Sequence, residues 1–421
     1  MEKVIIIGGG FGGLTSGKEL AKKDFNITVI DKTNHHLFQP LLYQVATAAL
    51  SPADIAIPIR SAFSKNKNVE VLLGEVKSID KEKKKIFFNG SEIEFDYLII
   101  ATGSRHSYFG KDEWEKYAPG LKTLNDALKI RENILLSLEA AELEKDPAKR
   151  QKYLNFVIIG GGPTGVELAG AISEIVNQNL ITDFRNIDAS MTKVYMIEAL
   201  PNILSSYPES LSNRALEDLK NLQVEVILNK KVTDINENGV KVDDKFIETK
   251  NILWAAGNQT LPLIKSLGVE TDKLGRVVVN DNLSFNEDNN IFVIGDAASV
   301  KNDKGENLPA IAPVAIQQGK YVVKIIAEGL IGKSYKKFIY KDRGTMATIG
   351  KAKAVAVIKG FKLSGLIAWL AWSFIHVLFL ISFRNKLRVM SEWIWYYITN
   401  RPGIRLIVKY TQDPVTKSVS E

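Results

Sequence analysis

A first glycine cluster in this chain has the spacing that binds a dinucleotide. In KVIIIGGGFGGL the pattern Gly-x-Gly-x-x-Gly falls on Gly8, Gly10 and Gly13. Glycine lets the backbone turn tightly and approach a pyrophosphate, whose charge then lies at the N-terminus of the following helix. Asp31 ends the next strand-like run, where its carboxylate can accept hydrogen bonds from a ribose diol. Strand, glycines, helix and spaced acid together predict a nucleotide site.

A second cluster repeats the pattern about 150 residues later. In NFVIIGGGPTGVEL the glycines are Gly160, Gly162 and Gly165, and the acid at the next strand-like run is Glu198. A carboxylate at this position repels a 2′-phosphate, and no Lys or Arg follows it before Arg214, so the pattern favours NADH over NADPH. The alternative reading of Glu198 is a solvated acid at a strand end.

The pattern of strands and helices around these residues predicts two doubly wound α/β domains. Each cluster stands between a short β-rich run and a helical segment. The strand-like run at 290–298, NIFVIGDAA, fits the first domain better than the second. We therefore predict a discontinuous first domain at 1–123 and 257–333, a second domain at 124–256, and a C-terminal region at 334–421.

Composition limits the chemistry. Of 421 residues, 45% are apolar and 24% are charged, which is typical of a globular chain. The chain has no cysteine, which excludes disulfides, thiolate zinc sites and iron–sulfur clusters. His35, His36 and His106 lack metal-ligand spacing, so no metal is predicted. The N-terminus does not resemble a signal peptide, so a cytoplasmic chain is expected. A redox protein of this composition needs an organic cofactor.

Three further segments resemble the flavoprotein reductases with two dinucleotide-binding domains. LIIATGS and LWAAGNQ are similar to the two crossover signatures of that superfamily, and IFVIGDAA is similar to its second flavin motif. The resemblance implies one non-covalent FAD per chain in the first domain and NADH as an exchanging substrate in the second. It also places His35 and His36 in a loop near the cofactor. The implied cofactor-binding residues are Gly8, Gly10, Gly12, Gly13, Asp31, Lys32, Val76, Thr102, Gly103, Asp296, Gly160, Gly162, Thr164, Gly165, Glu198 and Gly257.

Within that superfamily the chain resembles the type II, non-pumping NADH:quinone oxidoreductases. Disulfide reductases and sulfide:quinone reductases need cysteines, which this chain lacks. HHLFQPLLYQVATAALSPADIA, LPAIAPVAIQQG and FRNKLRVMSEWIWYYI look like segments of the type II family. The resemblance implies hydride transfer from NADH to FAD, then transfer of two electrons to ubiquinone or menaquinone, which takes up two protons. Two alternatives stay open: a reductase of ferredoxin, rubredoxin or oxygen, and an NADH-sensing flavoprotein.

The resemblance implies two catalytic residues, Glu167 and Gln317. Glu167 would lie near the nicotinamide and flavin, where it could position the amide or relay protons. The competing account is an acid stabilised by the helix macrodipole. Many family members have a glutamine where this chain has Pro313, so a quinone must be bound by Gln317, Gln318, a carbonyl or water. The alternative reading of Gln317 is a packing residue near a helix N-terminus.

The charge and the apolar pattern of the C-terminal region predict that it binds a membrane surface. Residues 333–421 carry a net charge of +12 against −5 for the rest, around the apolar run LSGLIAWLAWSFIHVLFLISF at 363–383. Read as a helix, this run has one stripe with Trp369, Trp372 and His376 and an opposite, wholly apolar stripe. Because its tryptophans lie mid-run and a basic amphipathic segment follows, we favour a helix in the interface over a buried or a spanning one.

The expected location is therefore the cytoplasmic face of the cell membrane, with peripheral (monotopic) attachment to anionic lipid. Nucleic acid is not expected as a partner, because the basic tail is also rich in Trp, Leu and Ile. A homodimer is left open. The residues expected to contact the membrane are Trp369, Trp372, Arg384, Lys386, Arg388, Trp393 and Trp395.

Overall fold

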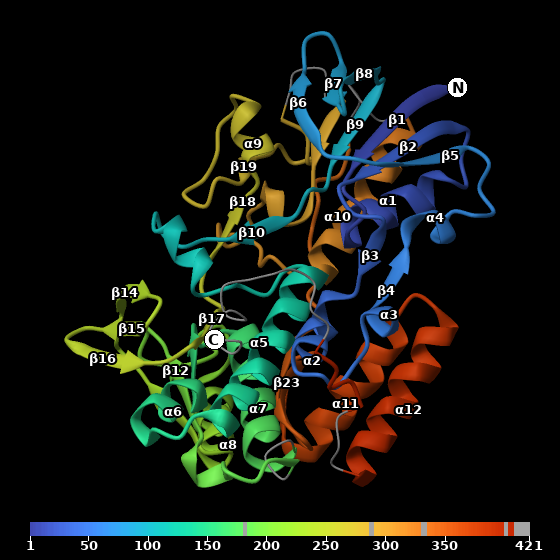
Figure 1. The fold of residues 1–421 in the computed structure, drawn as a ribbon. Helices are drawn as coiled ribbons and strands as arrows, with labels where there is room; N and C mark the ends of the chain where they lie inside the picture. Colours follow the sequence, from blue (N-terminus) through green and yellow to red (C-terminus); the bar gives the residue numbers. More distant parts are fainter. Residues whose placement is uncertain (180–182, 286–289, 330–334, 400–402, 408–421) are drawn as a thin grey trace. The chain divides into compact units, whose positions relative to one another are not determined.

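A computed structural model describes residues 1–179, 183–285, 290–329, 335–399 and 403–407 (Figure 1). The chain forms two compact units. Unit 1 comprises Met1–Leu37, Ala56–Arg105 and Asn258–Arg343, and unit 2 comprises Phe38–Ile55, His106–Gly257 and Gly344–Glu421. The boundaries of the units differ from those predicted for the three domains, which remain predictions.

Unit 1 is built on a five-stranded sheet in the order β20-β9-β1-β2-β5, with every neighbouring pair parallel. Pairing of β20 with β9 confirms that NIFVIGDAA joins the sheet of the first glycine cluster. The apolar run VEVLLGEV at 69–76 is divided at Gly74 into β5 and β6. The elements are β1 (Glu2–Ile7), α1 (Phe11–Leu20), β2 (Phe25–Asp31), β3 (His35–Leu37), β4 (Ala56–Pro58), α4 (Ile59–Ala62), β5 (Val69–Leu73), β6 (Val76–Asp80), β7 (Lys85–Phe88), β8 (Ser91–Glu94), β9 (Tyr97–Ile100), β10 (Ser104–His106, at the unit boundary), β18 (Asn258–Thr260), α9 (Pro262–Ser266), β19 (Val277–Val278), β20 (Ile291–Val293), β21 (Ala298–Ser299) and α10 (Ala312–Ala327).

Both faces of this sheet are buried, as its near-continuous apolar strands require. In β1 the side chains alternate: Val4 and Ile6 pack on one face with residues of α1 and α10, and Ile5 and Ile7 pack on the other with residues of β6, β7 and α9. The sheet is therefore a rigid support for the loops at the carboxyl ends of its strands, where the first glycine cluster lies.

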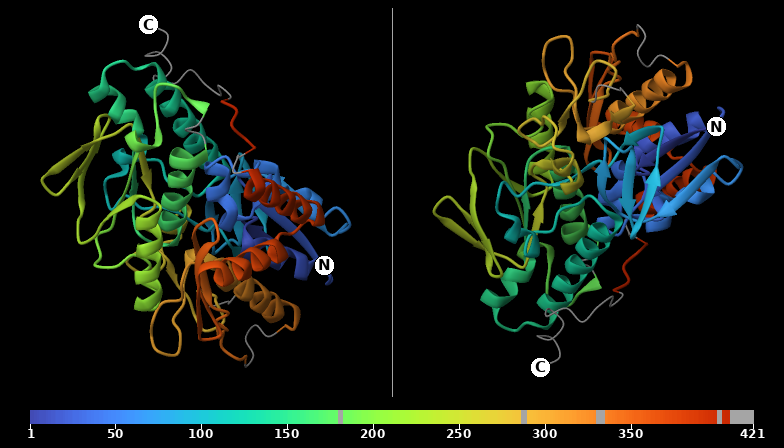
Figure 2. Two further views of the ribbon diagram at one scale, coloured as in Figure 1. Left: turned by 90° about the horizontal axis from the view of Figure 1, so that it is seen from below. Right: turned by 90° about the horizontal axis from the view of Figure 1, so that it is seen from above.

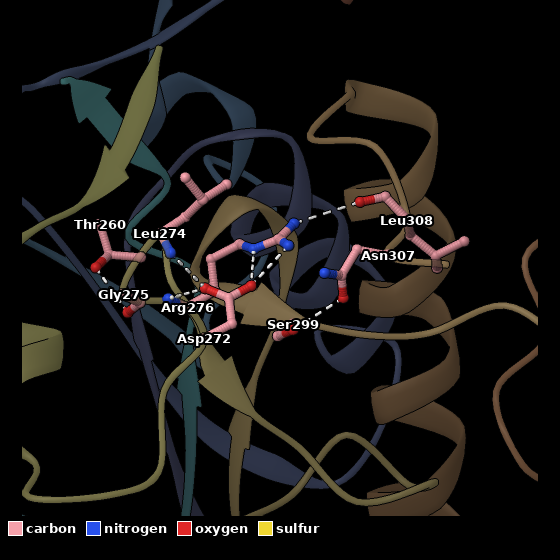
Figure 3. A network of polar contacts seen from close by, with 8 residues as sticks. All are labelled: Thr260, Asp272, Leu274, Gly275, Arg276, Ser299, Asn307 and Leu308. Carbon is pink, nitrogen blue, oxygen red and sulfur yellow. Dashed lines mark hydrogen bonds and ion pairs between the residues drawn. The ribbon is translucent and has the colours of Figure 1, made fainter. Parts of the chain in front are cut away.

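A half-buried ion pair fixes the chain that leads from β18 toward α10 (Figure 3). The guanidinium of Arg276 donates to Asp272 at 2.7 Å and reaches the carbonyl of Leu308 at 3.4 Å. Asp272 also accepts the backbone N–H of Leu274 and of Arg276. Burial opposes ionisation, but these hydrogen bonds hold the pKa of Asp272 below its usual range. The network ties the loop after α9 to the segment that precedes α10.

Unit 2 repeats the same parallel arrangement in a four-stranded sheet, β13-β12-β11-β17. β11 lies between β12 and β17 as β1 lies between β2 and β9, so the two glycine clusters occupy equivalent places. Two helices, α5 and α6, precede β11. The elements up to β17 are α2 (Leu42–Ala46), α3 (Pro52–Ile55), α5 (Leu124–Leu143), α6 (Pro147–Leu154), β11 (Asn155–Ile159), α7 (Pro163–Glu174), a π-helical turn (Ile175–Asn179), β12 (Lys193–Ile197), α8 (Glu209–Asn221), β13 (Val224–Ile227), β14 (Val232–Asn236), β15 (Gly239–Val242), β16 (Lys245–Glu248) and β17 (Asn251–Trp254). Short 3₁₀ turns complete the two units at Gln39–Leu41, Asp112–Lys116, Ala189–Met191 and Gly295–Ala297.

The rest of unit 2 is an antiparallel sheet followed by two adjacent helices, α11 and α12 (Figures 1 and 2). The strands are β22 (Thr345–Gly350), β23 (Lys353–Ile358) and β24 (Phe361–Ser364), and the helices are α11 (Gly365–Phe379) and α12 (Phe383–Thr399). The small side chains Ala354 and Ala356 on β23 let α11 approach closely through Ala368. The helix predicted over 363–383 is shorter in the structure: Leu363 and Ser364 belong to β24, the backbone leaves the helical conformation at Leu380, and the Nζ of Lys386 caps the carbonyl of Leu378. Within the described part of the chain, no helix has both the length and the hydropathy needed to cross a bilayer.

Candidate functional site

The first glycine loop is shaped by backbone atoms that leave no space for side chains. Gly8 has a φ of +104°, and a Cβ on it would stand 2.3 Å from the carbonyl oxygen of Ala101. A Cβ on Gly13 would stand 1.8 Å from the carbonyl oxygen of Gly8. Gly10, in contrast, has open space where its Cβ would be. The loop is thus closed on its inner side and accessible at Gly10, which is the shape of a pyrophosphate cradle at the start of α1.

The acid after each loop is hydrogen-bonded to the loop itself, in the same way in both units. Asp31 accepts the N–H of Gly9 at 2.6 Å, and Glu198 accepts the N–H of Gly161 at 2.6 Å. Each acid also accepts a backbone N–H two residues further on, from Thr33 and Leu200 respectively. Because each carboxylate oxygen has two lone pairs, acceptor capacity remains for a ribose diol.

Unit 2 repeats the shape of the loop as well. Gly160 has a φ of +110° and its Cβ would stand 2.8 Å from the backbone of Ala255, while Gly162 has open space. Gly103 and Gly257, each the third residue after its strand, have φ values of +70° and +71°. The internal repeat read from the sequence is therefore also a repeat of backbone geometry at the two predicted nucleotide sites.

Two features of unit 1 fit a dinucleotide beside the first loop. Thr102 follows Ala101 against the loop, and its buried Oγ1 has no hydrogen-bond partner among the residues that the structure describes. Asp296 accepts the hydroxyl of Ser104 at 2.7 Å, and Gln318 holds the neighbouring Gly295 by accepting its N–H at 2.7 Å. An orphaned hydroxyl, an open Gly10 and a fixed carboxylate are groups that a bound FAD can satisfy.

The other predicted cofactor-binding residues have different surroundings. Gly12 lies inside α1, where a Cβ would stand 3.0 Å from Ile294. Lys32 and Thr164 are exposed, and the side chain of Val76 is buried in the core of unit 1. A contact of these four residues with a cofactor stays a prediction.

The sequence analysis placed His35 and His36 in a loop. The structure instead has them in the strand β3, which pairs antiparallel with β4. His36 is buried, and its Nδ1 lies 2.9 Å from the carbonyl oxygen of Gly9, so it supports the first glycine loop. Burial lowers the pKa of His36 below its usual range, which keeps the ring neutral.

Unit 2 contains a cavity of about 60 Å³ on one face of α7. Its wall includes two carboxylates of this helix, Glu167 and Glu174, and the turn from Thr348 to Lys351 between β22 and β23. Aromatic residues of α11 and α12 complete the wall. The lining residues outside α7 and the turn are Tyr43, Gln44, Thr47, Ala49, Ile175, Trp369, Trp372, Trp393, Tyr396 and Tyr397.

A chain of hydrogen bonds runs along this wall from α12 to β22. The indole N–H of Trp393 donates to Gln44 at 2.7 Å, and Gln44 donates to the hydroxyl of Tyr43 at 2.9 Å. The hydroxyls of Tyr43 and Thr348 are 2.9 Å apart. The sequence analysis assigned no role to Tyr43, Gln44 or Thr348, although Tyr43 and Gln44 lie in the segment 35–56 that resembles the type II family. Only Glu167 of the cavity wall was predicted as catalytic.

Glu167 is the cavity group best suited to hold a proton. Burial raises the pKa of Glu167 to about 8, against a hydrogen bond from the backbone of Thr348 that lowers it. If stabilisation of the carboxylate by the helix macrodipole dominated, the pKa would fall instead. A proton-transfer role of Glu167 stays a prediction.

Gln317 lies in the second turn of α10, and its side-chain amide is already paired. Its Nε2 donates to the carbonyl of Lys341 and its Oε1 accepts the N–H of Lys341, both at 3.0 Å. One amide N–H and one lone pair remain for a ligand. Pro313 stands in the first turn of α10, where its missing N–H costs nothing. A quinone contact of Gln317 stays a prediction.

The residues predicted to contact a membrane lie on different sides of α11 and α12. Trp372 is 1% exposed and stacks on His376, so it cannot contact lipid in this structure, contrary to the prediction. Trp369 packs on Tyr397, and Trp393 bonds to Gln44. These tryptophans are not free to face lipid, because the stripe of α11 that carries Trp369, Trp372 and His376 packs against the rest of unit 2.

The opposite, wholly apolar stripe of α11 faces outward. Ile367, Leu370, Phe374 and Leu378 are 53% to 69% exposed, and Ile381, just after the helix, is 37% exposed. On α12, Leu387, Met390, Ile394, Trp395 and Ile398 are also exposed. Of the predicted cations, Arg384 is exposed, Lys386 caps α11 and Arg388 faces Asp54 at 3.8 Å. Two neighbouring helices thus present a large apolar surface.

Comparison with known proteins agrees with the two nucleotide cradles and with the apolar C-terminal helices. The sequence pattern of the pyridine nucleotide-disulphide oxidoreductases matches residues 2–319, and that of the NDH2 C-terminal domain matches residues 343–402. The chain is 40% identical over 417 residues to the type II NADH:quinone oxidoreductase Ndh of Mycobacterium tuberculosis, covering 95% of this chain and 89% of that one. It is also 40% identical to NdhA of the same organism over 93% of this chain and 86% of that one.

The chain belongs to the type II NADH:quinone oxidoreductases. Its fold is similar to that of NDH2 from Plasmodium falciparum in complex with NADH, with a TM-score of 0.88 and 23% identity over 97% of this chain and 100% of that one. The predicted fold class and enzyme class are confirmed. A type II NADH:quinone oxidoreductase passes electrons from NADH to a quinone without pumping protons, and this family is membrane-associated. Among the described residues, no cluster of acids and histidines could hold a metal ion.

Proposed function

We propose that unit 1 holds one non-covalent FAD, that unit 2 takes NADH in exchange with solvent, and that a membrane quinone is the final acceptor. The observation that carries this proposal is the duplicated cradle, Gly9–Asp31 in unit 1 and Gly161–Glu198 in unit 2, in a chain without cysteine. When bound, FAD accepts the hydride of NADH and passes two electrons to the quinone.

Each residue of the two cradles then has a defined role in binding. The open side of Gly10 and the N-terminus of α1 bind the pyrophosphate of FAD, and Asp31 accepts hydrogen bonds from its ribose. Thr102 and Asp296 supply a hydroxyl and a carboxylate beside it. Gly162 and Glu198 do the same for NADH, and the charge of Glu198 rejects a 2′-phosphate. Glu167 holds a proton for the quinone at its carboxyl group, which lines the cavity of unit 2.

The purified protein is expected to show one FAD per chain by its absorption spectrum and to oxidise NADH at least tenfold better than NADPH, as kcat/KM. A series of ubiquinone and menaquinone analogues should support turnover, whereas ferredoxin and rubredoxin should not. A protein that binds FAD but turns over only with a soluble acceptor would contradict the proposal. The series also identifies the quinone.

The membrane-facing surface is proposed to be the exposed stripe of α11 together with that of α12, at the cytoplasmic face of the cell membrane and against anionic lipid. Deletion of the two helices is a poor test, because Ala368 and Trp372 are buried against the body of unit 2. Single exposed positions are better suited. The homodimer remains a proposal without a described interface.

Replacing Phe374 by glutamate is expected to weaken binding to vesicles of mixed anionic and zwitterionic phospholipid at least tenfold. Phe374 is 69% exposed, so the change costs little folding stability, but it puts a carboxylate into an apolar, lipid-facing stripe. Vesicle co-sedimentation measures the effect. Phe246→Glu, at an exposed position of β16, is the matched control and should bind normally. Equal binding of both variants would refute the assigned surface.

A further inference from the structure

A second carboxylate, Glu174, borders the same cavity as Glu167. It is the last residue of α7 and lies seven positions after Glu167, which places both side chains on one face of the helix. At 1.5 Å per residue their Cα atoms are about 10 Å apart along the axis. Ala171 lines the cavity between them and leaves the space open.

The space between the two carboxylates suits water. A cavity of about 60 Å³ holds more than one water molecule, provided that polar partners surround it. The hydroxyls of Tyr43 and Thr348 and the amide of Gln44 lie on the wall with the two carboxyl groups. A hydrogen-bonded path from Glu174 to Glu167 can therefore be completed by water alone.

The reaction needs one proton that NADH does not supply. NADH gives a hydride, which is two electrons and one proton, whereas reduction of a quinone to the hydroquinone takes two electrons and two protons. One proton per turnover must enter from solvent. A carboxyl group that gives up its proton, such as Glu167, must be reloaded in each turnover, and a second carboxyl group on the same face of α7 can do so.

Glu174 has the surroundings of a group that can hold a proton. It is 8% exposed, and burial raises its pKa above the usual range. The groups that face it are the N–H of Lys351 at 2.5 Å, the hydroxyl of Tyr396 at 3.5 Å and the charges of Lys351 and Lys353, all of which oppose the rise. The Nζ of Lys351 is itself bound to the carbonyl of Tyr397 at 2.8 Å. Tyr43 and Glu167 face the cavity from its other side.

We propose that Glu174 takes up the solvent proton and passes it through water in this cavity to Glu167. In each transfer an O–H bond of the Glu174 carboxyl group breaks and one forms on water, and that water gives a proton to the carboxylate of Glu167. Water outside then reprotonates Glu174, so that protons balance and no electrons move. The inference rests on the proposed role of Glu167 in the quinone reaction.

The test is Glu174→Gln in the full-length, FAD-loaded protein. Glutamine keeps an acceptor for the N–H of Lys351 but cannot carry a proton. Stopped-flow absorbance should show flavin reduction by NADH unchanged within about twofold. Flavin re-oxidation by a water-soluble ubiquinone analogue should slow at least tenfold. Added imidazole, a diffusible proton carrier, should restore most of the lost rate. Infrared spectra should lose one protonated-carboxyl band relative to the wild type.

Three further variants separate proton transfer from structure. Glu174→Asp keeps an ionisable group and should retain more activity than Glu174→Gln. Ala171→Leu fills the cavity, keeps both acids, and should slow only the re-oxidation. Glu217→Gln, at an exposed site on α8, is the matched control and should change nothing. Melting temperatures within a few degrees of the wild type verify the fold.

The outcomes are distinct. If the wild type fails to reduce any quinone, the proposed function fails. If the wild type works and Glu174→Gln re-oxidises within twofold of it, only this inference fails. A slow Glu174→Gln that imidazole does not rescue, with an unchanged pH profile, would assign Glu174 to holding the turn at Lys351 and would overturn the relay.

Discussion

Replacing Glu167 by glutamine should slow flavin re-oxidation by quinone roughly 100-fold, the size typical of a lost general acid. The reductive half-reaction with NADH should stay within about twofold. Glutamine has nearly the same volume and can still accept the hydrogen bond from Thr348, so the loss reports the missing proton. Stopped-flow measurement of the two half-reactions separates these effects.

The same substitution is expected to change how stability depends on pH. The pKa of Glu167 is about 8 in the folded chain against an ordinary value of 4.5, so the folded state binds the proton more tightly than the unfolded state. Between these values the wild type therefore loses stability as pH rises, because only the unfolded chain can ionise freely. The glutamine variant has no such loss.

Urea unfolding at several pH values measures this difference. Relative to the wild type, the variant should gain stability from pH 5 to pH 8 by at most about 4 kcal/mol, at roughly 1.4 kcal/mol per pH unit. Partial opening of the side chain to the cavity makes a smaller gain the expected result. Glu167→Asp, which keeps an ionisable group, is the control and should retain the slope. A variant slower with both NADH and quinone, and with the wild-type pH slope, would mean that Glu167 positions the nucleotide instead.

The nucleotide cradles could be predicted from the sequence because they are local. A strand, three glycines and a helix lie within about 20 residues, and the acid ends the next strand. Parallel pairing of β1 with β2, and of β11 with β12, brings Asp31 and Glu198 to their loops without further information. The steric requirement at Gly8 and Gly13 is set by the same short segment.

The cavity of unit 2 could not be predicted in this way. Tyr43, Glu174, Thr348 and Trp393 come from four distant segments and share no periodicity or motif. They meet because α7 packs on β22, α11 packs on β23, and α12 packs on α3 and α11. The helical projection of 363–383 separated the two stripes correctly but could not decide that the tryptophan stripe faces inward, since that depends on Ala354 and Ala356 of β23.

Gly170 makes the contact between α7 and β22 possible. A Cβ on Gly170 would stand 1.6 Å from the carbonyl oxygen and 2.7 Å from the carbonyl carbon of Ile349. These are backbone atoms that cannot rotate away, so the strand must move. Ile349 lies next to Thr348, which bonds to Glu167, and two residues before Lys351, which bonds to Glu174. One glycine thus holds both carboxylates against their partners.

Gly170→Ala is therefore expected to destabilise unit 2 by about 2–4 kcal/mol, as measured by urea unfolding. Alanine alone would favour a helix interior by roughly 1 kcal/mol, so a net loss means that the clash with Ile349 exceeds this gain. Flavin re-oxidation by quinone should fall more than flavin reduction by NADH, because the displaced strand carries Thr348 and Lys351.

Gly162→Ala is the matched control for Gly170→Ala. Gly162 precedes the same helix, has a φ of −72° and has nothing within 4 Å of its Cβ position. Its replacement should change stability by no more than about 1 kcal/mol and raise the KM for NADH, because the new methyl group occupies the open side of the cradle. A Gly170→Ala protein as stable as Gly162→Ala would show that β22 can withdraw from α7 at little cost. The cavity and the paired carboxylates would then depend on contacts other than this one.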